Sequence, residues 1–205
     1  MYYRKSVAGE PRFHIKYFHA KSNQNPLTAK TVNSHKHKQA RLVKVKDNTL
    51  SNNMEIRSSS FKAGESIPPK FTCDDTGISP PLSWSNVPHG TKSFALIVDD
   101  PDASSITWVH WILYNIPATQ RDLPEDIPNT DTLENGASQG MNDSGEFGYS
   151  GPCPPSGNHR YYFKLYALDT ELHLKTGITK KELMKAMESH ILEEGQLMGR
   201  YKRKP

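Results

Sequence analysis

The segment from Trp108 to Ile116 constrains the fold more than any other part of this 205-residue chain. It is apolar on both faces, and only His110 and Asn115 interrupt the run. A run of this kind is typical of a strand at the centre of a sheet, buried on both sides. The segment therefore predicts a fold built on β-sheet. The fifteen prolines and thirteen glycines, which indicate many turns, favour the same class.

Two further segments carry strand signals. Residues 94–98 form a short apolar run that ends at Asp99-Asp100-Pro101-Asp102, where the proline stops strand pairing. The segment 159–168 alternates, which places His159 and Tyr161 on one face and Arg160 on the other. We expect Arg160 to be structural and paired with an acidic residue. Together with the segment 108–116, these segments give three predicted strands.

The connection from Pro117 to Asn158 is long, at 42 residues, and contains six glycines and six prolines. A connection of that length inside a domain is usually functional or contains short elements of its own. Its densest part, Gly148 to Pro155, can form neither a helix nor the interior of a sheet. We therefore expect this part to form an irregular loop.

One helix is predicted near the C-terminus. Thr179 and Glu182 have the spacing of a capping box, and Leu183, Met187 and Ile191 follow at helical spacing to form one apolar stripe. Gly195 is the expected stop. The sequence therefore predicts a mainly β fold with a C-terminal amphipathic helix.

The charge is divided unevenly along the chain. Residues 1–53 hold eleven Lys/Arg and two Asp/Glu, a net charge of +9, whereas residues 54–205 have a net charge of −5. The first segment has too few apolar residues to offset the entropy of ordering it. We favour a basic, disordered extension or a true start at Met54 over a nucleic-acid or membrane contact.

The absence of membrane and secretion signals bears on the location and redox state of the protein. No apolar run is long enough for a membrane-spanning helix, and residues 1–53 contain no secretory signal. These features indicate the cytoplasm. There the two cysteines, Cys73 and Cys153, are expected to stay reduced, although their number also fits one bridge.

Chemically active side chains follow or occupy the predicted strands. Asp100 and Asp102 stand where one strand ends, and His110 lies inside another, on the face that Trp108, Ile112 and Tyr114 share by alternation. His159 and Tyr161 share a face of the third strand. Three strands can bring these five groups together at the opening of one pocket. Each group also has a structural explanation, such as a turn at Asp-Pro-Asp or a satisfied core histidine.

No enzyme template fits these residues. Pro152 stands where the nucleophile elbow needs its second glycine, and no zinc, calcium, P-loop or dinucleotide motif is present. Asp99, Asp100, Asp102, His110 and His159 could bind a metal, but their spacing matches no known site. Cys153 with His159 could imitate a thiol nucleophile and its base, but prolines flank the thiol.

Taken together, these residues resemble the phosphatidylethanolamine-binding protein family, also called Raf kinase inhibitor-like proteins, in its bacterial and archaeal branch. The resemblance runs from about Met54 to Arg203. Its markers, in chain order, are Phe71-Thr72-Cys73-Asp74, Ser79-Pro80-Pro81-Leu82-Ser83-Trp84, Asp100-Pro101-Asp102-Ala103, Trp108-Val109-His110-Trp111, Gly148 to Pro155, and His159-Arg160-Tyr161. The segment from His190 to Tyr201 also looks like the family's C-terminal helix and tail.

The resemblance implies two packed antiparallel sheets with a C-terminal helix against them. It also implies a small pocket for phosphate or a phosphorylethanolamine headgroup, with no metal or other cofactor. The implied pocket residues are Asp100, Asp102, His110, Cys153, Pro154, Pro155, His159 and Tyr161. One departure is Ser104, which stands where the family usually has proline.

We therefore interpret residues 54–205 as a ligand-binding regulatory domain rather than an enzyme. By resemblance, its partner is a protein kinase or protease that it inhibits, and homodimers occur in the bacterial branch. Two alternatives stay open: a hydrolase using Cys153 and His159, and a nucleic-acid or membrane-surface binder that acts through its basic tail.

Overall fold

The computed structural model describes residues 53–204, which form two antiparallel β-sheets and one short α-helix. The smaller sheet has the strand order β1-β2-β5, and the larger one has the order β6-β4-β3-β7-β8. The strands are β1 (Glu55–Arg57), β2 (Leu82–Ser85), β3 (Ser93–Asp100), β4 (Trp108–Pro117), β5 (Asp122–Leu123), β6 (Ser138–Gln139), β7 (His159–Leu168) and β8 (Ile191–Tyr201), and the helices are the 3-10 turn η1 (Pro69–Phe71) and α1 (Lys180–Met187). The prediction of a mainly β fold is confirmed. The predictions for residues 1–53 lie outside the described residues, apart from Asn53.

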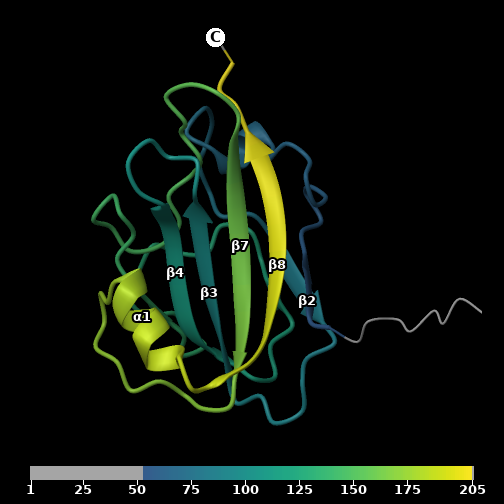
Figure 1. Ribbon diagram of the computed structural model, residues 1–205, viewed down its shortest axis with the longest axis vertical. Helices are drawn as coiled ribbons and strands as arrows, with labels where there is room; N and C mark the ends of the chain where they lie inside the picture. Colours follow the sequence, from purple (N-terminus) through teal and green to yellow (C-terminus); the bar gives the residue numbers. More distant parts are fainter. Residues whose placement is uncertain (1–52, 205) are drawn as a thin grey trace, which may run out of the picture. The chain divides into compact units, whose positions relative to one another are not determined.

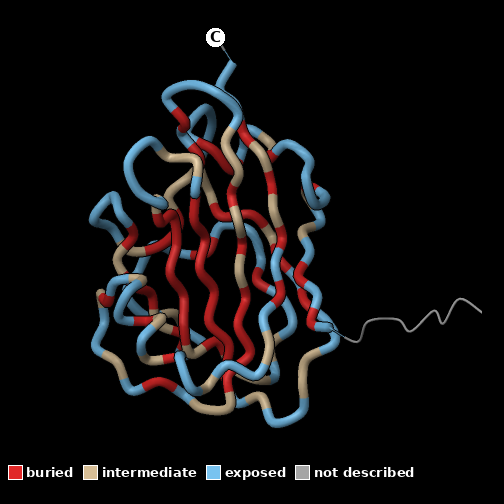
Figure 2. The backbone as a smooth tube through the Cα atoms, in the orientation of Figure 1, coloured by how far each residue is buried: buried red, intermediate tan, exposed pale blue. Residues whose placement is uncertain are grey.

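The strands β4, β3 and β7 lie side by side in the middle of the larger sheet (Figure 1). Every residue of β3 is buried, and Figure 2 shows buried backbone along most of these strands. One face packs on the smaller sheet, where the rings of Trp84 and Phe94 lie 5.4 Å apart. The other face packs on α1 through Ile112 and Leu183. The prediction of a central strand at Trp108–Ile116 is therefore confirmed.

The helix α1 begins as the sequence predicts. The Glu182 carboxylate accepts the Thr179 backbone N–H at 2.8 Å, and the Thr179 hydroxyl accepts the Glu182 N–H. Its buried residues are Leu183 and Met187. The helix ends at Met187, however, so the predicted continuation through Ile191 to Gly195 is wrong.

The segment after α1 is a strand, which corrects its assignment to a C-terminal helix and tail. Strand β8 pairs with β7 over ten residue pairs, from His159 with Tyr201 to Leu168 with Ile191. Along β8 the buried residues alternate, at Gly195, Leu197, Gly199 and Tyr201, which is the period of a strand. Without β8, the backbone N–H and C=O groups along this edge of β7 would have no partners. Pairing of β8 with β7 therefore outweighs a longer helix.

The glycine at position 199 makes close packing over β8 possible. A Cβ there would lie 2.6 Å from Ile67 Cγ1 and 2.8 Å from Phe61 Cε2. We expect Gly199→Ala to lower the free energy of unfolding by about 1–3 kcal/mol, because a methyl group would overpack this contact. Urea unfolding measures the change. Gln196→Ala, an exposed position on the same strand, is the control and should change stability by less than about 0.5 kcal/mol; equal values for the two variants would contradict the prediction.

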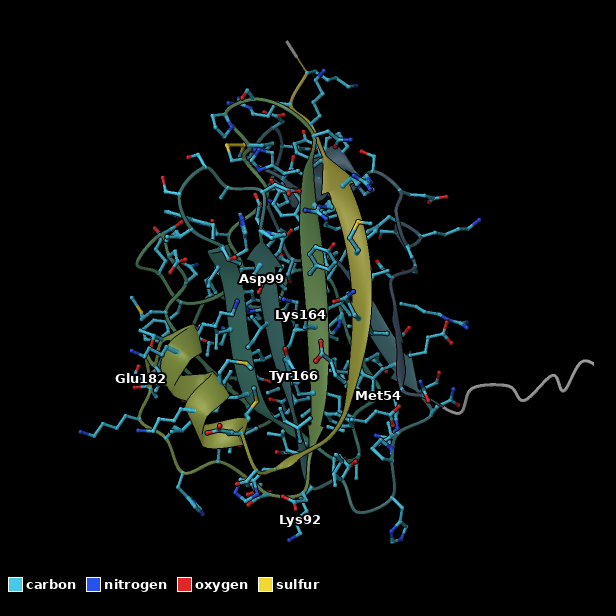
Figure 3. All side chains as sticks on the ribbon, viewed as in Figure 1. Met54, Lys92, Asp99, Lys164, Tyr166 and Glu182 are labelled. Carbon is cyan, nitrogen blue, oxygen red and sulfur yellow. A yellow bond between two sulfur atoms is a disulfide. The ribbon has the colours of Figure 1, made fainter. Side chains whose placement is uncertain are left out.

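One buried carboxylate joins the sheet to the helix. Asp99, at 0% exposure, accepts hydrogen bonds from Lys164 Nζ at 3.0 Å and from Lys180 Nζ at 2.5 Å. Lys164 lies on β7, beside Asp99 on β3 (Figure 3), and Lys180 is the first residue of α1. This three-residue group, the Asp99 ion cluster, ties α1 to two central strands.

Candidate functional site

A cavity of about 300 Å³ is lined by residues at one end of the larger sheet. At this end β3 ends and both β4 and β7 begin (Figure 1). Its walls come from those three strand ends, from the β3–β4 loop and from the loop before β7. The lining residues are Asp100, Ala103, Ser104, Trp108, His110, Ser144, Ser150, Gly151, Cys153, Pro154, Pro155, His159 and Tyr161. The structure thus brings seven of the eight sequence-predicted residues together around one cavity and leaves out Asp102.

A β-bulge in β4 directs His110 toward the cavity. Val98 pairs with Trp111 while the next residue, Asp99, pairs with Val109, so His110 is an extra residue on its strand. Its ring packs edge-on against Tyr161, with the centroids 5.2 Å apart. The prediction that His110 shares a face with Ile112 and Tyr114 is wrong, because both of those residues pack in the cluster beneath α1.

The His110 ring is fixed by the loop before β7. Its Nδ1 lies 2.7 Å from the carbonyl oxygen of Ser150. Since a carbonyl only accepts, Nδ1 carries the proton and Nε2 is left for another partner. Burial lowers the pKa of His110 below its ordinary value, although the Ser150 contact and the Asp100 carboxylate oppose this. The ring is therefore neutral near pH 7.

Asp100 orients the second histidine. Its Oδ2 accepts a hydrogen bond from His159 Nδ1 at 2.7 Å, and its Oδ1 accepts the backbone N–H of Asp102 at 2.8 Å. Asp100 is only 3% exposed. Because Nδ1–H donates to the carboxylate, His159 presents Nε2 as its free nitrogen, as His110 does.

The hydroxyl of Tyr161 is buried and has no hydrogen-bond partner within the described part of the chain. The residue is 1% exposed and lines the cavity beside His110. Burial, reinforced by the Asp100 charge, raises the pKa of Tyr161 well above its ordinary value, so the group stays a neutral donor. A buried hydroxyl that lacks a partner costs free energy unless a ligand or water satisfies it.

Asp102 has a structural role instead of a place in the cavity wall. Its carboxylate binds the Arg160 guanidinium at 2.6 Å and 2.9 Å and also accepts the Arg160 backbone N–H at 2.9 Å. The hydrogen bond from Arg160 is the largest cause that lowers the pKa of Asp102 to about 2. The predicted pairing of Arg160 with an acidic residue is confirmed. The pair ties the β3–β4 loop to the start of β7, next to His159.

The loop before β7 is joined to the segment after η1 by a disulfide between Cys73 and Cys153. The expectation that these cysteines stay reduced is therefore not met in the structure. The bridge spans 80 residues and becomes possible because the loop packs closely: a Cβ on Gly151 would lie 3.0 Å from the Thr72 backbone. The backbone N–H of Cys73 also donates to the Pro152 carbonyl at 3.1 Å. Cys153 thus stands in the cavity wall without a free thiol.

The five residues considered as a metal set do not converge. Asp99 binds Lys164 and Lys180, Asp102 binds Arg160, and no group of three His, Cys, Asp or Glu among residues 53–204 is arranged to hold a metal. Sequence reasoning also missed some of the lining, because Ser144 and Ser150 reach the cavity through loop shape rather than through a pattern.

The cavity offers donors without a permanent cation. Tyr161 Oη donates, the two Nε2 atoms donate when the rings are protonated, and no Lys or Arg is among the lining residues. The Asp100 carboxylate adds one negative charge. Such a lining suits a small ligand of low net charge that combines acceptor oxygens with a positive group.

Comparison with known proteins agrees with this fold. A family model described as "Phosphatidylethanolamine-binding protein" matches residues 57–202. A UPF0098 protein of Methanothermobacter thermautotrophicus is 51% identical over 150 residues, which cover 73% of this chain and 99% of that protein.

Two solved structures are similar to about three quarters of the chain. CT736 of Chlamydia trachomatis, described as a homolog of phosphatidylethanolamine-binding protein, is 44% identical with a TM-score of 0.70 and covers 75% of this chain and 100% of its own. YbcL of Escherichia coli is 35% identical with a TM-score of 0.69, over 74% and 99% of the two chains. Among residues 53–204, no helix has the length and apolar character needed to span a bilayer. The chain belongs to the phosphatidylethanolamine-binding protein family, with the UPF0098 proteins and YbcL as its relatives.

Proposed function

We propose that the cavity binds a small phosphate-bearing ligand of the phosphorylethanolamine type. The observation that carries this proposal is the buried Tyr161 hydroxyl, which lacks a partner in the described residues. It shares the cavity lining with two histidines whose Nε2 atoms are free. Phosphate oxygens would accept from the hydroxyl, and from each Nε2 when its ring is protonated. Bound phosphate would satisfy the hydroxyl, whose burial is otherwise unfavourable.

The charge of the lining supports a zwitterion over a simple dianion. With no Lys or Arg in the wall, the Asp100 carboxylate would repel phosphate unless the ligand also carried a positive group. An ethanolamine ammonium can supply that charge. The cavity volume of about 300 Å³ is also sufficient for a headgroup of this size.

We propose a binding protein rather than a catalyst. In the hydrolase alternative Cys153 would be the nucleophile, but its sulfur is bonded to Cys73 and cannot act as a thiolate while that bond stands. The alternative that assigns function to the basic tail depends on residues 1–53, outside the described residues.

Regulation of a partner is the second part of the proposal. Family resemblance implies inhibition of a kinase or a protease, and we propose that a partner of that kind responds to the ligand-bound protein. We also propose a cytoplasmic location, and self-association as a homodimer by the same resemblance. These assignments depend on surfaces other than the cavity.

The pH dependence of binding tests the role of the histidines. We expect affinity for glycerophosphoethanolamine to rise about three- to tenfold between pH 7.5 and 5.5, because His110 has a lowered pKa and gains its proton below pH 6.5. The phosphodiester charge is constant over this range, so the change reports on the protein. Calorimetric titration of the full chain measures it.

The control is His110→Asn, whose amide can keep the contact to Ser150 without titrating. This variant should show a flatter pH profile than the wild type. A wild-type profile that is flat between pH 5.5 and 8, with binding intact, would remove the histidines from ionic contact with phosphate.

A further inference from the structure

The segment from Cys153 to Asn158 forms one wall of the cavity but is weakly attached. No backbone or side-chain hydrogen bond within the described residues is made by any of its six residues. Cys153, Pro154 and Pro155 line the cavity; within the segment Pro154 is buried, whereas Cys153 and residues 155–158 are exposed. The neighbouring residues are better held: Ser150 N–H donates to the His110 carbonyl, and Pro152 accepts from Cys73. Between Pro152 and β7, the segment is therefore held by the disulfide and by the packing of Pro154, without hydrogen bonds in the described part of the chain.

The other end of the bridge is anchored firmly. Phe71 and Thr72 are buried, and the Phe71 carbonyl accepts the Tyr149 hydroxyl at 2.9 Å. Asp74 accepts Tyr201 Oη at 2.6 Å and Arg203 Nε at 2.8 Å, which fixes this segment to the end of β8. The disulfide thus joins this wall segment, which makes no hydrogen bonds among residues 53–204, to a segment that several hydrogen bonds hold.

We infer that the Cys73–Cys153 bridge sets the ligand affinity of the cavity, so that its reduction by a dithiol weakens binding. This inference rests on the proposed ligand-binding function. With the bridge closed, Pro154 and Pro155 are held in place before the ligand arrives, and binding does not have to order them. With the bridge open, ligand binding must also order residues 153–158, at a cost in affinity.

The chemistry balances with a dithiol as the reductant. A thiolate of the dithiol attacks one sulfur of the bridge and forms a mixed disulfide, and the other cysteine leaves as a thiolate that takes a proton. The second thiol of the reagent then attacks the reagent's own sulfur in the mixed disulfide, and the remaining cysteine leaves as a thiolate that takes a proton. Two electrons pass to the protein, which ends with two thiols, while the reagent ends as a cyclic disulfide. Both Cys73 and Cys153 are exposed, so attack is not blocked by burial.

The test is calorimetric titration of the full chain with O-phosphorylethanolamine, before and after reduction by dithiothreitol. Because the chain has only two cysteines, the reagent acts on this bridge alone. We expect affinity to fall about tenfold on reduction. Cys73→Ser is the matched variant, since Cys73 is not a lining residue and its loss opens the bridge without replacing any residue of the cavity wall. In dithiothreitol it should bind like the reduced wild type.

A second readout does not depend on the ligand. Amide NMR relaxation at residues 156–158 should show increased motion on reduction, while residues of β3 stay unchanged. If oxidised protein binds and reduction alters neither affinity nor relaxation, the inference is overturned. If oxidised protein does not bind a phosphate probe, the proposed function fails, and the relaxation data alone then decide whether the bridge holds the wall.

Discussion

Replacing Asp100 with alanine is expected to weaken binding of O-phosphorylethanolamine by at least about 30-fold, or about 2 kcal/mol. The carboxylate accepts hydrogen bonds from His159 Nδ1 and from the backbone N–H of Asp102. Its loss frees the His159 ring to turn and loosens the β3–β4 loop, so two parts of the cavity lose their position at once. Calorimetric titration measures the change.

The matched control for this variant is Asp169→Ala. Asp169 pairs with His190 Nδ1 at 2.8 Å, so the chemistry of the pair is the same, but neither residue lines the cavity. The control should bind within about twofold of the wild type, and circular dichroism should show both variants folded. Unchanged binding by a folded Asp100→Ala protein would exclude the carboxylate from the site.

Replacing Asp99 with asparagine is expected to give the largest loss of stability, about 2–4 kcal/mol in the free energy of unfolding. Asparagine keeps the size of the side chain but removes the charge that two lysines share. The side chains of Lys164 and Lys180 are 24% and 29% exposed, so water screens their charges only in part. The helix α1 should therefore loosen from the sheet.

Urea unfolding measures the Asp99→Asn effect, with Asp122→Asn as the control. Asp122 is exposed on β5 and should change stability by less than about 0.5 kcal/mol. Adding Lys180→Met to Asp99→Asn should recover part of the loss, because it removes one uncompensated charge. A folded Asp99→Asn protein as stable as the control would show that the Asp99 ion cluster adds nothing.

Local patterns were enough to predict the central strands and the start of α1. The strand at Trp108–Ile116 is apolar on both faces because sheet and helix cover it, and this burial is visible in composition. The capping box at Thr179 and Glu182 is equally local, since both hydrogen bonds form within four residues.

Features that depend on distant contacts could not be predicted in the same way. The bulge at His110 shifts one strand against its neighbour without a marker in the sequence, and the bridge between Cys73 and Cys153 requires two loops 80 residues apart to meet. The strands β1, β2 and β5 have at most four residues each, too short for a clear alternation. Strand β8 did carry a signal, the alternation of Gly195, Leu197, Gly199 and Tyr201, but the helical spacing before it masked that pattern.

The central claim is that phosphate ligands occupy the cavity between His110, His159 and Tyr161. The most direct measurement is the NMR signal of each histidine Hε1 proton during titration of the full chain with O-phosphorylethanolamine. His89, His173 and His190 are internal controls, because none of them lines the cavity. The account predicts saturable shifts of the His110 and His159 signals alone among these five. Binding that shifts the control histidines and leaves His110 and His159 unmoved would contradict it.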